Sequence, residues 1–240
     1  AVASFSGGLV EGWPAFEAGD KGISVGVAGG PEGTARAGGL ATAEGATNAE
    51  FNSGAPPSGG GTVQLVTEKK ILEALLEDVG AAGPGDRVDL AMFYLSHRRI
   101  VEALVDAHGR GASVRLVLDP NKDAFGREKK GIPNRQVAYE LVNRSGGGIQ
   151  VRWYDTQGEQ FHTKLVMVTR GDSVVIFGGS ANLTRRNIGD FNLEADLRFS
   201  LPSDAPLALT VGDYFERVYR NLGGKHTLPF EAYRDDSLLR

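Results

Sequence analysis

The 240-residue sequence contains no cysteine, and this absence removes several kinds of chemistry. Disulfide bonds, metal sites built from thiolates and cysteine nucleophiles are all excluded. The absence does not identify a compartment, because proteins of the bacterial cytosol and of the periplasm can both lack cysteine.

Long apolar runs are also missing. No apolar stretch approaches the roughly 20 residues of a membrane-spanning helix, so the sequence predicts none. The chain starts at Ala1 without an initiator Met or a basic-then-apolar signal, and we interpret it as processed or excised. Any targeting signal would already be removed, so cytoplasmic, periplasmic and secreted locations all fit.

An excess of one charge is missing from most of the chain. The formal net charge is −4, and residues 1–61 hold six acidic and two basic residues, which leaves 24 of each in residues 62–240. A body without net charge argues against indiscriminate nucleic-acid binding through a large positive field. It leaves room for local recognition of phosphate groups.

Glycine, by contrast, is abundant in one part of the chain. Residues 1–61 contain 16 of the 34 glycines and end in Pro-Pro-Ser-Gly-Gly-Gly, a composition that orders poorly. We expect residues 1–61 to be an irregular head and linker, whose apolar opening is a docked strand or the tail of an upstream domain. Residues 62–240 are expected to form the main domain.

From Thr62 onward, the apolar pattern alternates between strands and helices. Strands are expected at residues 63–66, 87–95, 113–119, 149–154, 165–168, 174–177 and 191–200, and helices at 68–79, 97–109, 135–143 and 205–221. Thr67 and Ser96 are the expected N-caps of the first two helices. This order predicts an α/β fold, and the late hairpin makes the sheet mixed, with helices on both faces.

Polar residues follow two of the expected strands, where ligands gather in α/β sheets. Tyr94, Asp119 and Asn121 are candidates at this rim. We favour structural roles for them, with Tyr94 as an amphipathic side chain and the other two as turn formers beside Pro120.

The segment 161–187 carries the strongest functional signal. On a strand, residues two apart share a face, so His162 and Lys164 point the same way. The apolar run from Leu165 to Val168 indicates a central strand covered on both faces. An imidazole and an ammonium at the start of such a strand need partners, because burying an unpaired polar group is costly.

The hairpin brings Gly179, Ser180 and Asn182 to the His162 end. Lysine supplies a positive charge, serine and asparagine supply neutral donors, and glycine permits close approach, which together suit a phosphate group. A histidine nitrogen can attack phosphorus or protonate a leaving alkoxide. A buried structural histidine beside an ordinary turn is the alternative, which is favoured for a lone histidine but not for this combination.

A histidine in this role needs its second nitrogen fixed by a carboxylate or a carbonyl. Alternation along residues 191–200 places Asn192, Glu194 and Asp196 on one face and the apolar residues on the other. We choose Glu194 as the orienting carboxylate, with Asp196 as the second choice.

These residues resemble the signature of the phospholipase D superfamily, His-x-Lys-x4-Asp followed by Gly-Ser-x-Asn. The positions that match are His162, Lys164, Gly179, Ser180 and Asn182. Glu194 stands where the family's supporting acid is expected, and the resemblance covers about residues 62–221. It implies the phospholipase D-like sandwich of a sheet between helices.

The match has one departure. Thr169 occupies the place of the signature aspartate, and the Gly-Ser pair falls three residues later than the strict spacing. A longer hairpin turn explains the shift, with Asp172 as a stand-in for the aspartate. An inactive copy of the domain is the alternative.

The resemblance implies a two-step mechanism without metal or cofactor. One histidine attacks the phosphodiester to form a phosphohistidine, a second protonates the leaving group, and water or an alcohol then releases the product. The other histidines, His97, His108 and His226, start no second motif. The second histidine is therefore expected from a twin chain or, as we favour, from a lost half, since this chain resembles the C-terminal half of a two-motif bacterial member. His162 is then either the nucleophile or the general acid.

Phospholipid is the substrate that the resemblance implies first, hydrolysed or transferred to an alcohol. The loop 121–135 supplies a basic rim for headgroups or for peripheral membrane contact, and solvated loop charges are an equal alternative. Its charges are Lys122, Arg127, Lys129, Lys130 and Arg135, against Asp123 and Glu128. Arg185 and Arg186 follow shortly after residues 179–182, the turn expected to bind phosphate, which we call the phosphate turn. A metal-independent nuclease is the runner-up, because aromatic and basic residues do not interleave, and a non-catalytic phosphate-binding or scaffold domain is third.

Overall fold

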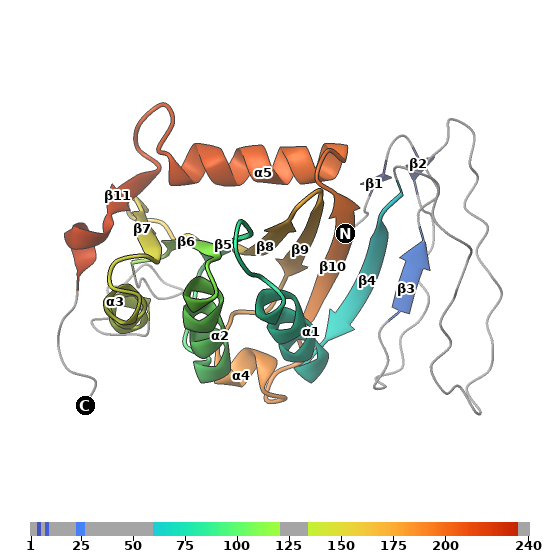
Figure 1. Ribbon diagram of the computed structural model, residues 1–240, viewed down its shortest axis with the longest axis horizontal. Coiled ribbons are helices and arrows are strands. Elements are labelled where there is room, and N and C mark those ends of the chain that lie inside the picture. Colours follow the sequence, from blue (N-terminus) through green and yellow to red (C-terminus); the bar gives the residue numbers. More distant parts are fainter. Residues whose placement is uncertain (1–3, 6–7, 10–22, 27–59, 121–133, 235–240) are drawn as a thin grey trace.

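The structure, a computed structural model, describes residues 4–5, 8–9, 23–26, 60–120 and 134–234 of the chain (Figure 1). Its strands are β1 (Ser4–Phe5), β2 (Gly8–Leu9), β3 (Ile23–Gly26), β4 (Thr62–Thr67), β5 (Arg87–Met92), β6 (Ser113–Leu118), β7 (Gln150–Tyr154), β8 (Lys164–Arg170), β9 (Ser173–Gly179), β10 (Ala195–Pro202) and β11 (Thr227–Pro229). Its helices are α1 (Lys69–Gly80), α2 (Arg98–Gly109), α3 (Asn134–Arg144), α4 (Arg185–Ile188), α5 (Pro206–Tyr219) and the 3-10 helix η1 (Phe230–Tyr233).

One mixed sheet organises these elements, in the strand order β11-β7-β6-β5-β8-β9-β10-β4-β3. Strands β5, β6 and β7 are parallel neighbours, because helices α2 and α3 connect them. The other neighbours, including the β8–β9 hairpin, are antiparallel. Helices α1, α2 and α3 lie on one face of the sheet and α5 lies on the other (Figure 1). The predicted α/β fold, with a mixed sheet and helices on both faces, is confirmed.

Two hydrophobic layers form because the central strands are apolar on both sides. Alternate residues of one strand belong to different layers: Val166 of β8 faces the side of α1, α2 and α3, whereas Met167 packs in the layer with Phe215 of α5. Strand β8 lies between β5 and β9, and Leu165 to Val168 are buried, as the apolar run predicts.

The start of α1 differs from the prediction, which made Thr67 the N-cap. Strand β4 continues through Thr67, which pairs with Ala195, so Glu68 becomes the residue before the helix. Glu68 makes no side-chain capping hydrogen bond. The Lys69 N–H instead donates to the Asp190 carboxylate at 2.8 Å, so the cap comes from a distant part of the chain.

Two further boundaries correct the sequence prediction. His97 rather than Ser96 precedes α2, and it too lacks a side-chain cap. The strand expected at residues 191–200 starts only at Ala195, because Asp190 turns away with a positive φ of 63° to cap α1. The alternation expected before Ala195 is therefore wrong.

The predicted head contributes short strands in the part of it that the structure describes. Strand β3 pairs antiparallel with β4 at the edge of the sheet, and β1 pairs with β2 within the apolar opening of the chain. The rest of residues 1–59 lies outside the described residues. The division of the chain at residue 61 stays a prediction.

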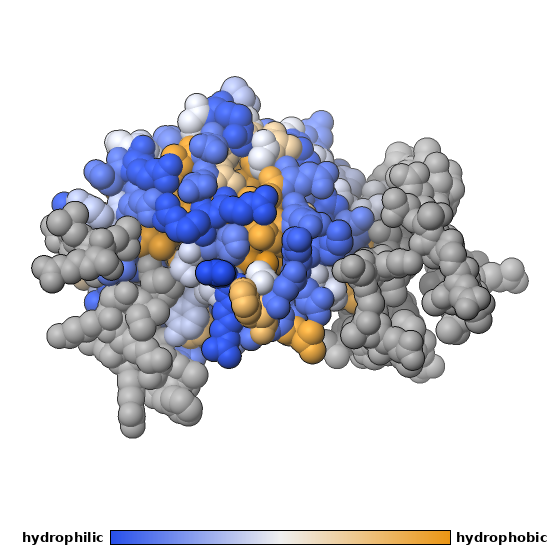
Figure 2. Space-filling view, turned by 90° about the horizontal axis from the view of Figure 1, so that it is seen from below, coloured by the Kyte–Doolittle hydropathy of each residue, from blue (hydrophilic) through white to orange (hydrophobic). Residues whose placement is uncertain are grey.

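The surface seen from below is mainly hydrophilic, with hydrophobic residues reaching it in separate places (Figure 2). Within the described ranges, no helix is both long enough and apolar enough to cross a membrane.

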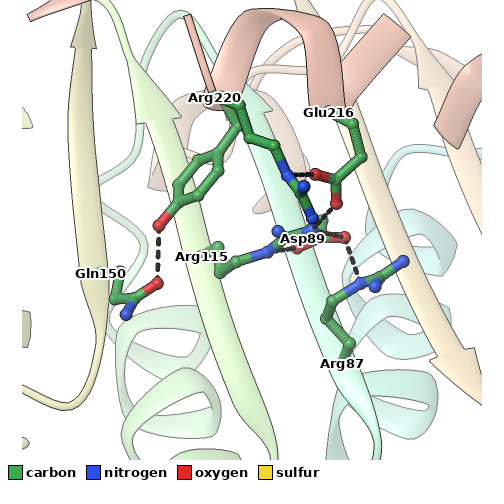
Figure 3. Close-up of polar contacts among 7 residues, drawn as sticks. Arg87, Asp89, Arg115, Gln150, Glu216 and Arg220 are labelled. Atoms are coloured by element: carbon green, nitrogen blue, oxygen red, sulfur yellow. Dashed lines mark hydrogen bonds and ion pairs between the residues drawn. The ribbon is translucent and has the colours of Figure 1, made fainter. Parts of the chain in front are cut away.

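A buried ion cluster joins α5 to the sheet (Figure 3). Arg115 of β6 donates to both carboxylate oxygens of Asp89 on β5, at 2.7 and 2.9 Å, and to Glu216 of α5 at 2.7 Å. Its guanidinium also lies 5.2 Å from the ring centre of Phe215 and 4.7 Å from that of Tyr219. Because the Asp89–Arg115 pair is removed from water, each of its charges is stabilised by its partner and not by hydration. Removal of one partner therefore leaves the other charge uncompensated.

Removing one partner of this cluster should destabilise the fold. Arg115→Ala leaves the Asp89 carboxylate buried with less compensation, and we expect the free energy of unfolding to fall by about 3 kcal/mol in urea denaturation. Arg87→Ala is the matched control, because Arg87 donates to the same carboxylate at 2.8 Å from a side chain that is 40% exposed. It should cost less than about 1 kcal/mol, and equal costs for the two variants would contradict the role given to burial.

Candidate active site

The candidate site lies where three neighbouring strands bring polar residues to one face. Lys164 opens β8 opposite Met92 of β5, and Gly179 closes β9 opposite Asp196 of β10. Leu165 pairs with Gly178, so the two ends of the hairpin lie side by side. The structure thus brings the His162 segment and the Gly-Ser turn together at the start of β8.

His162 and Lys164 contact each other directly. The Lys164 Nζ lies 3.1 Å from His162 Nε2 and donates to the His162 carbonyl at 3.0 Å. Phe93, directly after β5, packs against both side chains. Its ring centre lies 4.7 Å from that of His162 and 5.2 Å from the Lys164 ammonium. With an ammonium as donor, Nε2 of a neutral imidazole accepts.

Burial shifts both pKa values downward, and the charge of Lys164 adds to the shift of His162. Burial lowers the pKa of His162, the Lys164 charge lowers it further, and Asp119 opposes the shift. Burial lowers the pKa of Lys164 to about 8, against the opposing charges of Glu194 and Asp196. At neutral pH the imidazole is therefore neutral and the ammonium is mostly charged.

Glu194 is bound to the phosphate turn. The Ser180 hydroxyl donates to its carboxylate at 2.5 Å, and the Asn187 amide of α4 donates to its other oxygen. No hydrogen bond among the described residues joins Glu194 or Asp196 to the His162 ring. The orienting role chosen for Glu194 stays a prediction, and Ser180 must leave Glu194 before its hydroxyl can donate to a phosphate.

Asn182 has an unsatisfied side-chain atom. Its Oδ1 is buried and has no hydrogen-bond partner within the described part of the chain. The oxygen and nitrogen of an amide are interchangeable in such an assignment, so this position can present an N–H to a ligand. The phosphate-binding role of Asn182 stays a prediction.

Asp196, the second choice for the orienting carboxylate, is buried beside the turn. It accepts a hydrogen bond from the Ala181 N–H at 3.1 Å. Burial raises its pKa to about 6, although the Ala181 N–H opposes the shift. Gly179 is required opposite it, because a Cβ at residue 179 would collide with the Asp196 carboxylate and the Ala195 carbonyl.

Of the three rim candidates, two lie in the described part of the chain. Asp119 is fully buried and accepts the Phe161 N–H at 2.8 Å, so it fixes the residue before His162. Tyr94 stacks on Phe93 with ring centres 3.9 Å apart. Asn121 lies outside the described residues.

Arg135 is the one charge of the predicted basic loop 121–135 that lies in the described part of the chain. Arg135 donates to the Pro120 carbonyl at 2.9 Å and lies 4.7 Å from the ring centre of Tyr233, so it is engaged in the fold. The other charges of the loop, residues 122–130, lie outside the described residues. Arg185 and Arg186 begin α4 and are exposed.

Asp172 occupies the far end of the hairpin. It lies in the turn after Arg170, and Thr169 pairs with Val174 next to that turn. Both positions are thus separated from His162 by the length of β8. That Asp172 replaces the signature aspartate stays a prediction. At this position Asp172 belongs to the hairpin turn and not to the candidate site.

The sequence analysis missed three residues that hold the site. Phe93 and Asn187 have the contacts described above, and the third, Asn134, is fully buried. Its amide accepts the Leu95 N–H at 2.9 Å and donates to the carbonyls of Phe93 (2.6 Å) and Asp119 (2.9 Å). An asparagine directly after a proline at a helix start was the available signal, but its partners are distant in sequence.

Metal ligands are not gathered here: within the described ranges, no three His, Asp or Glu side chains form a group that could hold a metal ion.

Comparison with known proteins relates the chain to phosphodiester chemistry. Residues 75–219, more than half of the chain, match the family described as "Cardiolipin synthase, PLD-like domain". The structure is similar to Nuc, a phospholipase D family member from Salmonella typhimurium (TM-score 0.50, 18% identity, 70% of this chain and 99% of that one). NucT from Helicobacter pylori (0.51, 18%, 70% and 98%) and phosphatidylserine synthase from Haemophilus influenzae (0.50, 12%, 73% and 42%) are also similar. At these identities the likeness concerns the fold, and no curated protein matches the sequence.

The close fit at Gly179 gives a testable prediction. Gly179→Ala should lower the free energy of unfolding by about 1–3 kcal/mol and displace Asp196, because the added methyl group has no room. Gly178→Ala is the matched control, since the nearest atom to its Cβ would be the Lys164 carbonyl oxygen at 3.9 Å, an ordinary contact. Thermal unfolding of the two variants checks this, and a fully stable Gly179→Ala would show that the turn does not need glycine.

Proposed function

We propose, from the premise that the chain belongs to the family of cardiolipin synthase PLD-like domains within the phospholipase D superfamily, that it cleaves or transfers the phosphodiester bond of a phospholipid through His162. Members of this superfamily are phosphodiesterases and phosphatidyltransferases. The family's description names a lipid enzyme, which supports phospholipid ahead of nucleic acid as the substrate.

The observation that carries the proposal is the 3.1 Å contact between the His162 and Lys164 side chains at the edge of the Gly-Ser turn. A neutral imidazole beside a charged ammonium pairs a nucleophile with a stabiliser of phosphate oxygens. Asn182, in the turn that follows β9, has a buried Oδ1 without a partner in the described part of the chain, and its amide group can supply a neutral donor once it reorients. The lowered pKa of His162 favours the nucleophile over the general acid, because a general acid must carry a proton at working pH.

In the proposed first step, the Lys164 ammonium moves from His162 Nε2 to a phosphate oxygen, which frees the Nε2 lone pair. His162 Nε2 then forms a bond to phosphorus while the P–O bond to the leaving alcohol breaks. Lys164 stabilises the charge on the non-bridging oxygens, and a second histidine gives its proton to the leaving alkoxide. In the second step a water oxygen attacks phosphorus, the N–P bond breaks, and the water proton passes to the second histidine. An alcohol in place of water gives transphosphatidylation.

The second histidine is proposed to come from another copy of the chain or from another half of a larger protein. His97 precedes α2, His108 lies in the last turn of α2, and His226 precedes β11, so the three lie on other elements than the hairpin. The measurement that separates the two sources is the mass of the active species by light scattering.

Removal of the nucleophile gives the main test. His162→Ala should reduce alcohol release from phosphatidylcholine by about 10³-fold or more, in the chain together with any partner half. His226→Ala serves as the control, because His226 precedes the edge strand β11, and it should keep full activity. If plasmid DNA is degraded without added metal while lipid stays intact, the protein is a nuclease and the proposed phospholipid activity is wrong. Inactivity toward both, with the protein folded and paired, would point to a non-catalytic domain.

The shifted pKa values predict a bell-shaped dependence of kcat/KM on pH. The acid limb should lie below pH 6.5, because His162 must lose its proton to attack and its pKa is lowered from that value. The alkaline limb should lie near pH 8, where Lys164 loses its charge. Lys164→Arg stays charged throughout and should remove the step near pH 8, even if its rate is lower, so that any alkaline limb that is left comes from the second histidine, which must be protonated to act as the general acid.

Asp196 is the control for the acid limb, because its pKa of about 6 falls in the same range. Asp196→Asn should leave the acid limb in place if His162 produces it. An alkaline limb that persists unchanged in Lys164→Arg would mean that Lys164 is not the group that titrates there.

A further inference from the structure

The loop between α4 and β10, residues 189–194, exposes two large apolar side chains beside the candidate site. Phe191 is 64% exposed and Leu193 is 85% exposed. Leu193 directly precedes Glu194, whose carboxylate holds Ser180. Single exposed apolar residues are ordinary on protein surfaces, but two on one short loop at a site indicate a contact surface.

Polar groups at both ends anchor this loop. The Asp190 carboxylate accepts the Lys69 N–H at 2.8 Å and so caps α1. At the other end, the Glu194 carbonyl accepts the Glu68 N–H at 3.1 Å. The chain between these anchors is short, so the two apolar side chains are held outward by the fold.

Two cationic side chains contact the loop. The Arg185 guanidinium lies 5.5 Å from the ring centre of Phe191. Arg186 donates to the Asn192 side chain at 3.2 Å. Both arginines are exposed, and α4, which carries them, lies at the lower edge of the molecule in Figure 1. An apolar tip with cations beside it combines the two features that bind anionic lipid surfaces.

The two carboxylates of the loop take their hydrogen bonds from the fold and not from the arginines. Asp190 accepts the Lys69 N–H at the positive end of α1, and Glu194 accepts hydrogen bonds from Ser180 and Asn187. Neither Arg185 nor Arg186 forms an ion pair within the described part of the chain, so both guanidinium groups beside the apolar tip can bind an external anion.

We propose that Phe191 and Leu193 enter the surface of an anionic phospholipid bilayer while Arg185 and Arg186 bind its phosphates. The docked loop places the hydrogen-bonded pair Ser180 and Glu194 at the membrane. Phospholipid headgroups then reach the His162 end of β8. The proposal rests on the proposed function and deepens it, because it states how a lipid substrate is delivered.

A bilayer fits this surface better than a second copy of the chain. A twofold contact of the loop with itself would bring Arg185 and Arg186 of one copy against those of the other. A nucleic-acid backbone would match the cations but would leave the two apolar side chains in water. An anionic bilayer satisfies both kinds of side chain.

Sedimentation of the full chain with phosphatidylglycerol vesicles tests the proposal. Phe191→Ser/Leu193→Ser should weaken vesicle affinity by at least about tenfold, because two apolar side chains no longer enter the bilayer. Leu209→Ser/Leu222→Ser is the matched control, with two leucines 54% and 55% exposed, on α5 and just after it. It should bind like the unsubstituted protein, and Phe191→Leu/Leu193→Met should keep binding because its side chains stay apolar.

Three results would overturn the proposal. The first is equal vesicle binding by Phe191→Ser/Leu193→Ser and the unsubstituted protein. The second is a lower molecular mass of that variant without lipid, which would assign the loop to a contact between copies. The third is that Phe191→Ser/Leu193→Ser loses affinity for a DNA oligonucleotide while its vesicle binding is unchanged.

Turnover of water-soluble bis-p-nitrophenyl phosphate separates this inference from the proposed function. Phe191→Ser/Leu193→Ser should keep that turnover, since the loop's apolar side chains act only at the bilayer. If the unsubstituted protein binds vesicles through the loop but turns over no phosphodiester, the proposed function fails and the docking surface stands.

Discussion

The start of β8 is the position on which the candidate site depends. Because β8 is covered on both faces, Lys164 enters the sheet where water is scarce, and burial lowers its pKa to about 8. The same desolvation, together with the Lys164 charge, lowers the pKa of His162. The 3.1 Å contact between the two side chains therefore joins a neutral imidazole to a cation. Attack on an anionic phosphodiester requires this combination of an uncharged nucleophile and a fixed positive charge.

Contacts on both faces of the sheet keep this arrangement in register. On the α5 face, Arg115 binds Asp89 and Glu216 and so ties the helix to β5 and β6. On the other face, the buried Asn134 joins the chain segments that follow these two strands. Glycine at residue 179 lets β9 and β10 approach closely enough for the Asp196 carboxylate to receive the Ala181 N–H. The site is thus a product of strand packing more than of any one loop.

The loop at residues 189–194 connects the chemistry to the molecular surface. One end of it caps α1 through Asp190, and the other end supplies Glu194 to the phosphate turn. Leu193 is followed directly by Glu194, which is hydrogen-bonded to Ser180. A contact at the exposed Phe191 and Leu193 is therefore close in the chain to the candidate site. In the proposed function this arrangement couples the arrival of a lipid surface to the position of the turn.

The sequence by itself determined the order of the elements and the central hairpin, because apolar periodicity is a local property of the chain. His162 and Lys164 were predicted to share a face of one strand, but β8 begins at Lys164, so their contact comes from the segment that leads into the strand. Tertiary structure alone decided which partners the carboxylates take. Glu194 binds Ser180 and Asn187, partners that the sequence did not indicate, and its predicted role of orienting His162 stays a prediction. The chain before it departs from a strand, because Asp190 caps α1 and β10 begins only at Ala195. Hydrogen-bond partners far apart in the chain are set by how strands pack and end, and no local pattern records that.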